Sequence, residues 1–524
     1  MSAVTTANSQ PAASRFGKPR RPGTVTAAVV AVLVALTFVP LGYVGWAFVT
    51  TGPVRAAELI FRPRVGELLV NTVGLVVVTV PICVALGVGA AWLVERTDVP
   101  GRALWRPLLV TPLAVPAFVN SYAWVGVIPS MHGFFAAALV TTLSYFPFVY
   151  LPVAATLRRL DPAVEESARA LGSSTAAVFV RMVLPQLRLA ILGGGLLIGI
   201  HLLAEYGAFA MLRFNTFTTA IFEQFQATFD GAAGSMLAGV LVLLCLLLLV
   251  TEASARGRAQ FARLGSGAPR PTSPLRLGGA RMPALATLVA LSALALGVPA
   301  WTILRWLWIG GVDVWRLDDI TIAIAQTVGL AGAGAFAATM LAYPVAWVAV
   351  RTRGPLARLV EGANFVTSSL PGIVTALSLV TVGIRVVPPL YQTVALLLCA
   401  YVLMFIPRAL VSVRSGLAQV PIGLEEASGS LGAAPTMTFA RITLRLTAPA
   451  AASGAAMVFV AVSTELTATL LLAPTGTRTL SMRFWSLASE LDYAAAAPYA
   501  AIMVVLALPI TMLLVQQSSK VAAL

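Results

Sequence analysis

The chain has few charged residues for its length. Charged side chains make up 10% of its 524 residues, hydrophobic residues make up 59%, and the mean hydropathy is +0.90. A soluble domain carries about 25% charged residues, and its surface is too large for this many apolar side chains to be hidden. A water-soluble globular fold is therefore excluded, and lipid is the solvent that suits the apolar surface.

Lysine is almost absent. The two lysines are Lys18, which is followed by Pro19, and Lys520, which is followed by Val521. A phosphate-binding loop of the GxxxxGK[ST] type needs lysine followed by serine or threonine. The sequence has no such loop, so we expect neither nucleotide hydrolysis by that route nor a cofactor bound by this chain.

Cysteine and histidine are scarce as well. The three cysteines (Cys83, Cys245 and Cys399) lie far apart within apolar runs, so a disulfide framework is not expected. The two histidines, His132 and His201, are a thin supply for the catalytic site of an intramembrane enzyme.

The formal net charge of +15 has two candidate explanations. Nucleic-acid binding would need a basic face or a reading motif, and the arginines are instead scattered singly between apolar runs. The excess of positive charge in the cytoplasmic loops of membrane proteins explains it better. We predict a lipid bilayer as partner and no nucleic acid.

Apolar runs of about 20 residues are long enough to cross the hydrocarbon core as helices. The fold class predicted is all-α integral membrane protein with twelve transmembrane helices. The first run is too long for the core of a signal peptide, so we expect an uncleaved span. The runs lie near 25–49, 67–94, 107–129, 133–156, 189–212, 234–251, 283–308, 320–349, 362–384, 389–411, 448–473 and 497–516.

The orientation follows from the basic residues. A cytoplasmic N-terminus places most of the 35 lysines and arginines in cytoplasmic segments, which predicts that both termini are cytoplasmic. The segment 256–281 is rich in Arg, Gly, Pro and Ser and is typical of a linker. The domains predicted are a disordered cytoplasmic tail (1–24), a first six-span half (25–252), a cytoplasmic linker (253–281) and a second six-span half (282–518).

The two halves are tandem copies. A spacing of 260 pairs Glu166 with Glu426 and Gly172 with Gly432, and a spacing of 255 pairs the sequence TVGL at 72–75 with its copy at 327–330. Each half has an even number of spans, so both have the same topology. Parallel repeats of this kind in transporters are related by an axis along the membrane normal, and the solute passes between them.

A small polar segment recurs between spans four and five and between spans ten and eleven: VEESARALGSS (164–174) and LEEASGSLGAA (424–434). Asp161 suits a helix N-cap, Gly172 suits a C-terminal cap, and Ser173 or Ser174 suits the cap of a second helix that runs to Pro185. We predict a helix–turn–helix outside the membrane. One copy alone would favour an ordinary capped loop, but two copies, each followed by a phenylalanine (Phe179 or Phe439), favour docking of a partner with two equivalent grooves.

This segment resembles the signature of permease subunits of ATP-binding-cassette importers: Glu-Ala-Ala, three residues, Gly, nine residues, Ile-x-Leu-Pro. The chain has Glu166-Ser167-Ala168, Gly172 and Met182-x-Leu184-Pro185, then Glu426-Ala427-Ser428, Gly432 and Ile442-x-Leu444-Arg445. Arg445 departs from the usual proline and puts the end of the second docking helix in doubt. The resemblance implies coupling to an ATPase through Glu165, Glu166, Ala168, Gly172, Leu184, Pro185, Glu425, Glu426, Ala427, Gly432 and Leu444.

The resemblance also implies the surroundings of the chain. Two copies of an ATPase subunit, which would bind ATP and magnesium, are expected at the cytoplasmic face, and a binding protein outside a bacterial inner membrane. Residues 205–225 and 465–486 resemble fused ferric-iron importer permeases. Thiamine, phosphonate and polyamine permeases share this architecture and stay open as alternatives. A six-plus-six secondary transporter is a further alternative, because the loop 95–102 faintly resembles its signature.

Charged side chains inside spans are costly and mark functional sites by default. Glu205 and Glu465 are repeat-equivalent, and carboxylates facing a shared path would suit a cation. His201 lies one helical turn before Glu205, and Tyr206 directly follows Glu205. We expect these four residues as candidates for the substrate pathway. The alternative is a structural role in hydrogen bonding and helix packing.

Overall fold

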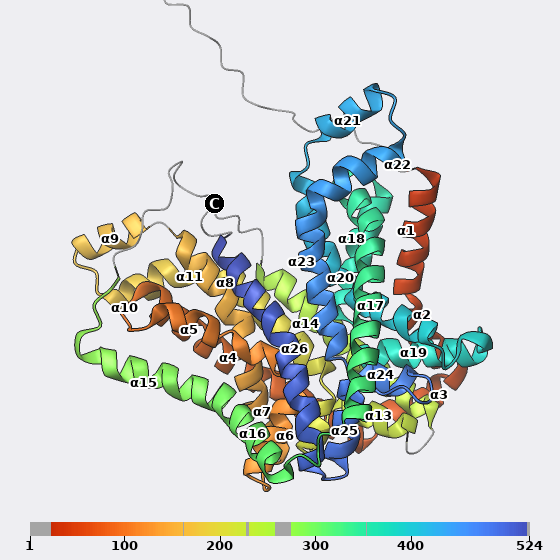
Figure 1. The fold of residues 1–524 in the computed structure, drawn as a ribbon, viewed down its shortest axis with the longest axis horizontal. Helices are drawn as coiled ribbons and strands as arrows, with labels where there is room; N and C mark the ends of the chain where they lie inside the picture. The colour runs from red at the N-terminus through yellow and green to blue at the C-terminus, as the bar shows by residue number, and fades with distance from the viewer. Residues whose placement is uncertain (1–22, 161, 227–229, 257–273, 353, 521–524) are drawn as a thin grey trace, which may run out of the picture. The chain divides into compact units, whose positions relative to one another are not determined.

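The computed structural model describes residues 23–160, 162–226, 230–256, 274–352 and 354–520. The predicted N-terminal tail, except its last two residues, the predicted cap Asp161 and the linker segment 257–273 lie outside the described residues. Within those ranges the regular structure is helical, apart from an isolated bridge between Thr97 and Leu275. The predicted all-α class is confirmed (Figure 1).

The α-helices form in the following order along the chain. They are α1 (Thr24–Thr37), α2 (Val39–Thr51), α3 (Pro53–Ile60), α4 (Pro63–Arg96), α5 (Arg102–Leu108), α6 (Ala117–Val127), α7 (Gly133–Tyr145), α8 (Pro147–Arg159), α9 (Pro162–Ala170), α10 (Thr175–Val178), α11 (Leu184–Ala204), α12 (Gly207–Met211), α13 (Phe217–Gln226), α14 (Gly231–Arg256), α15 (Arg281–Ser292), α16 (Val298–Gly310), α17 (Leu317–Arg351), α18 (Pro355–Ser369), α19 (Gly372–Arg385), α20 (Val394–Gln419), α21 (Ile422–Ser430), α22 (Pro435–Thr438), α23 (Leu444–Ser463), α24 (Thr467–Leu472), α25 (Leu480–Ser489) and α26 (Tyr493–Lys520).

Nine helices among the described residues are long and apolar enough to cross a membrane, and three interrupted helix pairs raise the number to twelve if each pair counts as one span. Each of the twelve predicted runs overlaps one of these nine helices or three pairs, and the runs 189–212 and 448–473 extend past the ends of their helices at Ala204 and Ser463. The interrupted pairs are α1 with α2, α5 with α6, and α18 with α19.

The third run is not the single straight helix that the hydropathy suggests. The chain bends by 93° between 102–114 and 117–127. Pro116 stands at the break with extended backbone angles (φ −55°, ψ 143°). Proline lacks an N–H and disfavours helical geometry in the residue before it, so the helix stops there. Pro371, its partner in the repeat, precedes α19 in the same conformation (φ −63°, ψ 141°).

The structure divides into two compact parts, and each is described by itself. The smaller part holds the described residues up to Phe38 together with Ala335–Ser368 and Phe405–Val458. The larger part holds Val39–Gly334, Ser369–Met404 and the described residues from Phe459 onward. This division does not follow the sequence repeat, so the larger part contains elements of both halves.

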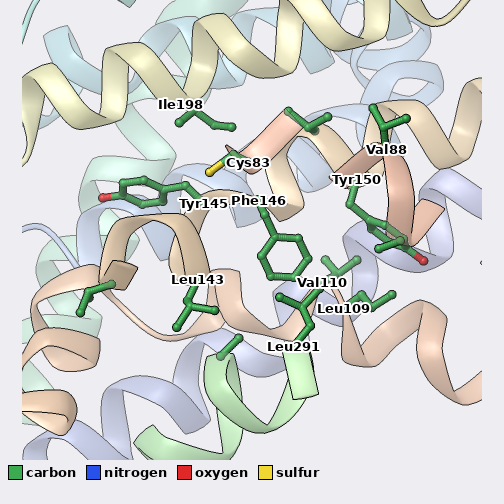
Figure 2. Packing of buried hydrophobic residues seen from close by; sticks show 14 of the residues in the cluster. Cys83, Val88, Leu109, Val110, Leu143, Tyr145, Phe146, Tyr150, Ile198 and Leu291 are labelled. Atoms are coloured by element: carbon green, nitrogen blue, oxygen red, sulfur yellow. The ribbon is translucent and has the colours of Figure 1, made fainter. Parts of the chain in front are cut away.

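In the larger part, α8 packs closely between α4 and α11. A Cβ atom on Gly87 of α4 would lie 2.9 Å from the Tyr150 nitrogen, and one on Gly194 of α11 would lie 2.7 Å from the Phe148 carbonyl oxygen. Such glycines let helix backbones approach each other within a membrane. Figure 2 shows the buried cluster around them, in which the ring of Phe146 points toward Val110.

The smaller part repeats one of these contacts. A Cβ atom on Gly454 of α23 would lie 3.3 Å from Cα of Ala409 in α20. The equivalent contact in the first half is that of Gly194 with Cα of Val149, at 2.9 Å, because Gly454 follows Gly194 by 260 residues and Ala409 follows Val149 by 260. The two halves therefore share a packing contact as well as a sequence pattern, which agrees with duplication.

Elements of the two sequence halves share one apolar cluster in the larger part. The ring of Phe484 (α25) lies 5.5 Å from that of Phe118 and 5.2 Å from that of Tyr122, both on α6. The Tyr122 hydroxyl donates to the Tyr493 carbonyl oxygen at 2.5 Å. The halves are therefore joined by packing as well as by the chain.

The end of the predicted linker is bound to the first half. The N–H of Leu275 donates to the Arg96 carbonyl oxygen at 2.9 Å, and the Asp98 N–H donates to the Leu275 carbonyl oxygen at 3.0 Å. The Leu277 N–H donates to the Asp98 carboxylate at 2.9 Å. These three bonds hold the start of the second half beside the end of α4.

Candidate functional site

The first of the two segments predicted to dock a partner, named here the first docking segment after that prediction, is the helix–turn–helix formed by α9 and α10. Gly172 has φ +89°, a left-handed conformation that suits glycine. The Ser173 N–H donates to the Ala168 carbonyl oxygen at 3.0 Å, and the side chain of Ser174 accepts from the Ala177 N–H at 3.3 Å. The predicted caps at Gly172 and Ser174 are confirmed, and the predicted cap at Asp161 lies outside the described residues.

The second docking segment, α21 with α22, has the same plan in the smaller part. Gly432 has φ +78°, and the Ala433 N–H donates to the Ser428 carbonyl oxygen at 3.1 Å. The hydroxyls of Ser428 and Thr438 are 2.8 Å apart and join the two short helices. In the first segment the equivalent positions are the buried Ala168 and Val178. Within the smaller part, α21 and α22 lie beyond the ends of α18, α20 and α23 (Figure 1).

Each segment continues into the next span without a stop. A single π turn (Phe179–Val183 or Phe439–Thr443) connects α10 to α11 and α22 to α23. In the first copy, the predicted end at Pro185 of the helix that follows Ser174 is wrong, because residues 175–204 form one run of 30 residues. Proline is tolerated there, in the first turn of α11. The same turn forms before Arg445, so the proline is not what produces it.

The predicted coupling residues divide by exposure. Those that reach the surface are Glu166, Gly172, Pro185, Glu426, Ala427 and Gly432. Leu184 and Leu444 are half-buried, and Glu165, Ala168 and Glu425 are buried. The adjacent glutamates of each segment thus have different surroundings, one inside and one outside.

Two leucines that the sequence reasoning missed stand at the tips of the segments. Leu171 and Leu431 are each 88% exposed and lie 260 residues apart. Each directly precedes the capping glycine, which is the signal that could have identified them. A single exposed leucine is common on protein surfaces, and it is the recurrence at equivalent positions of the repeat that distinguishes these two.

Phe179 and Phe439, which the sequence predicts to be part of a docking surface, pack instead against long spans of their own halves. The Phe179 ring meets Trp92 of α4 edge to face at 5.8 Å. The Phe439 ring meets Tyr343 of α17 edge to face at 5.3 Å. Both phenylalanines pack against their own spans, although Phe439 is also 37% exposed. Leu171 and Leu431 are the most exposed large apolar side chains among the described residues of the two segments.

The buried glutamates of the segments pair with arginines at the ends of long helices. Glu165 Oε1 lies 3.0 Å from Arg96 Nη2, where α4 ends. Glu425 Oε1 lies 3.3 Å from Arg351 Nη2, where α17 ends. Arg96 and Arg351 correspond in the repeat, but only the three-dimensional structure shows that they pair with the buried glutamates.

The spans after the docking segments are interrupted at the predicted pathway glutamates. Helix α11 ends at Ala204 and α12 begins at Gly207, and between them Glu205 accepts from the Ala208 N–H at 2.9 Å and from the Tyr145 hydroxyl at 2.7 Å. Glu465 stands in the same place between α23 and α24. It accepts from the N–H of Ala468 at 2.8 Å, and from the N–H and the hydroxyl of Thr469 at 2.9 and 2.6 Å.

These bonds show what the two carboxylates do locally. A chain that leaves the helix at membrane depth must satisfy its backbone groups from within the protein. Each glutamate side chain accepts from the first N–H groups of the short helix that follows it. Its own carbonyl oxygen accepts a hydroxyl, from Thr218 at 2.5 Å for Glu205 and from Ser481 at 2.7 Å for Glu465. The geometry supports the structural alternative for both residues.

The other two pathway candidates are packed. The ring of His201 lies 4.6 Å from that of Phe148, and its Nδ1 is 2.7 Å from the Leu197 carbonyl oxygen. Tyr206 is buried, with its ring 4.3 Å from Phe222 and 5.5 Å from Trp485. Among the residues that the structure describes, no three His, Cys, Asp or Glu side chains gather as a metal site requires.

The two interruptions meet in the larger part. A Cβ atom on Gly207 would lie 3.0 Å from the Leu466 side chain and 2.9 Å from Cβ of Phe118. Gly207 is two residues after Glu205, and Leu466 is one residue after Glu465. The broken spans of the two halves therefore approach each other closely at Gly207 and Leu466.

Comparison with known proteins agrees with this geometry. The family model described as "binding-protein-dependent transport system inner membrane component" matches the chain twice, over residues 84–253 and 334–521. The repeat inferred from the spacing of 260 is thus confirmed. Each match contains one of the two segments and one span that is interrupted at a glutamate, Glu205 or Glu465.

Similar curated proteins are transport permeases. An Fe(3+)-transport system permease protein of Haemophilus influenzae is 34% identical over 93% of this chain and 97% of its own length. A sulfate transport system permease protein of Synechocystis is 32% identical over 34% of this chain and 73% of its own. A spermidine/putrescine transport system permease protein of Escherichia coli is 27% identical over 32% of this chain and 73% of its own. The chain belongs to the family of inner-membrane components of binding-protein-dependent transport systems, and it is a multi-pass permease with two fused halves.

Proposed function

We propose that the chain is the membrane permease of an ATP-driven ferric-iron importer, with both permease halves in one polypeptide. A binding protein outside the membrane delivers the ion, two copies of a separate ATPase dock at the cytoplasmic face, and the halves move between outward-open and inward-open states. Both termini are cytoplasmic in this arrangement, and ATP with magnesium is bound by the ATPase alone. The observation that carries the proposal is the pair of matched docking segments in a chain without a phosphate-binding loop.

The docking role is supported by the surface of each segment. Glu166 and Leu171 in one copy, and Glu426 and Leu431 in the other, are exposed on a short capped turn. A carboxylate beside an apolar tip suits a groove with a basic rim. Two copies per chain fit two ATPase subunits.

The choice of ferric iron as the substrate is supported by the share of this chain that each relative matches. The Fe(3+) permease matches both halves, whereas the sulfate and spermidine/putrescine permeases match about a third of the chain. Sulfate and polyamine are therefore the competing cargoes that a test must include, with thiamine and phosphonate. Glu205, Glu465, Tyr206 and His201 remain candidates for the path between the halves, acting through the shape of the interrupted spans.

The test is uptake by proteoliposomes that contain the permease, its ATPase and the binding protein. ATP-dependent entry of ferric iron, with no entry of sulfate, spermidine, thiamine or phosphonate, is the expected result. Glu166→Arg and Gly172→Pro should uncouple ATP hydrolysis from uptake while insertion stays intact. Glu490→Arg, at an exposed position between α25 and α26, is the matched control and should import normally. Iron uptake without ATPase, or unchanged uptake by both docking variants, would overturn the proposal.

A further inference from the structure

The two buried ion pairs described above join each docking segment to the span that ends beside it. The side chains of Arg96 and Glu165 are 6% and 10% exposed, and those of Arg351 and Glu425 are 5% and 6% exposed. Each pair lies within one compact part of the structure. The docking helices that carry the glutamates are only nine residues long.

The surroundings of the two pairs differ, and the pairing itself is what they share. Glu165 also contacts Arg169 at 3.0 Å, one turn along α9, and Gly429 occupies the equivalent position in α21. Arg351 also donates to the Val420 carbonyl oxygen at 2.8 Å, just after α20. A by-product of local packing would not be expected to keep the same arginine and the same glutamate while their neighbours change.

A buried pair of this kind resists separation. When one partner is lost, the other is left as an uncompensated charge away from water, whereas an exposed pair is screened and contributes little. Each docking helix is thus held at Glu165 or Glu425, one residue before the exposed Glu166 or Glu426. A displacement of the exposed surface must therefore move the end of α4 or α17.

We propose that Arg96 with Glu165, and Arg351 with Glu425, are positioning residues that transmit movement of the docked ATPase to the long spans α4 and α17. The proposal rests on the docking role proposed above. In this proposal the first glutamate of each Glu-Glu pair (Glu165 or Glu425) joins the docking segment to its long span. The second glutamate (Glu166 or Glu426) contacts the ATPase. The arginines are then part of the coupling apparatus although no partner touches them.

The test measures ATP hydrolysed per ferric ion imported, in proteoliposomes with the ATPase and the loaded binding protein, together with the amount of ATPase that the permease retains on an affinity resin. The variants are Glu165→Gln, Arg351→Gln and Glu425→Gln, with Arg351→Lys as the conservative change. The control is Arg414→Gln, because the Arg414–Glu361 pair (3.1 Å) is about half exposed on both sides. We expect the ratio to rise roughly tenfold in the three glutamine variants, the scale on which changes along a coupling path act, with ATPase retention unchanged. Arg351→Lys and Arg414→Gln should stay near the wild-type ratio.

The outcomes separate the two proposals. If the wild type retains no ATPase, the docking role fails. If the wild type retains ATPase and the glutamine variants keep its ratio, the link between segment and span is overturned. Loss of ATPase retention in step with a lower unfolding temperature would also overturn it, because the pairs would then only hold the fold together.

Discussion

The Tyr145 hydroxyl donates to the Glu205 carboxylate at 2.7 Å, whereas the Tyr401 hydroxyl is bonded to Thr469, which in turn donates to Glu465. With the spacing of 260, Tyr401 corresponds to a position one helical turn before Tyr145. Each half therefore has a tyrosine near its own copy of the repeated glutamate, but the two tyrosines stand at different positions of the repeat. One contact is direct, and the other passes through a threonine.

Tyr145→Phe should destabilise the permease, because it removes the hydroxyl that, beside the Ala208 N–H, donates to the partly buried Glu205 carboxylate. A hydrogen bond between side chains of membrane helices contributes about 1–2 kcal/mol. The measurement is thermal unfolding of the purified protein in detergent. Tyr391→Phe, at a partly exposed position, is the control and should unfold like the wild type. An unchanged unfolding temperature for Tyr145→Phe would show that the Glu205 bond contributes nothing.

Leu171→Asp combined with Leu431→Asp should abolish retention of the ATPase, because each substitution places a charge at the apolar tip of a docking segment. Each single variant should retain the ATPase more weakly than the wild type, since one segment stays intact. The measurement is co-purification on an affinity resin. Leu491→Asp changes a leucine that is 66% exposed in the turn between α25 and α26 and is the matched control. Normal retention by the double variant would contradict the assignment of the tips.

Arg445→Pro should leave stability and uptake close to wild type. Proline inside a helix usually costs about 3 kcal/mol, but the equivalent Pro185 follows the same π turn without ending the helix. Ala456→Pro, in the middle of α23, is the control and should unfold at a clearly lower temperature. If Arg445→Pro is as damaging as Ala456→Pro, the two copies are not equivalent here.

Gly207→Leu should block transport while the ATPase stays bound. Even a single added carbon would lie 2.9 Å from Phe118 and 3.0 Å from Leu466, so a leucine would push the two interrupted spans apart. The measurement is iron uptake beside ATPase co-purification. Gly89→Leu, on α4 with open space around it, is the control and should import iron. Uptake by the Gly207 variant would mean that this close approach is not needed.

The spans and the duplication could be read from the sequence because both are properties of long stretches. An apolar run of about 20 residues has few alternatives to a membrane helix. The docking turns were also predictable, since Gly172 and Ser174 form their bonds with residues a few positions away. Because the same capping residues occur in both copies, few other backbone conformations were compatible with these turns.

The links across the fold were not predictable in the same way. Nothing near Glu165 in the sequence points to Arg96, because the pair forms only when α8 and α9 return toward the end of α4. The same holds for Tyr145 and Glu205, 60 residues apart. The interruption at Pro116 was visible in principle, but hydropathy averages over about 20 residues and hides a local change of direction.

The bonds from Leu275 and Leu277 to the end of α4 bear on why the halves are encoded as one chain. The second half begins already attached to the first, and the aromatic contacts of α6 with α25 add a second attachment. A gene divided between codons 257 and 273 should therefore yield two polypeptides that assemble when made together. The covalent joint then serves mainly to fix the ratio of the two halves. Every transporter receives one copy of each half, and pairs of two identical halves do not form.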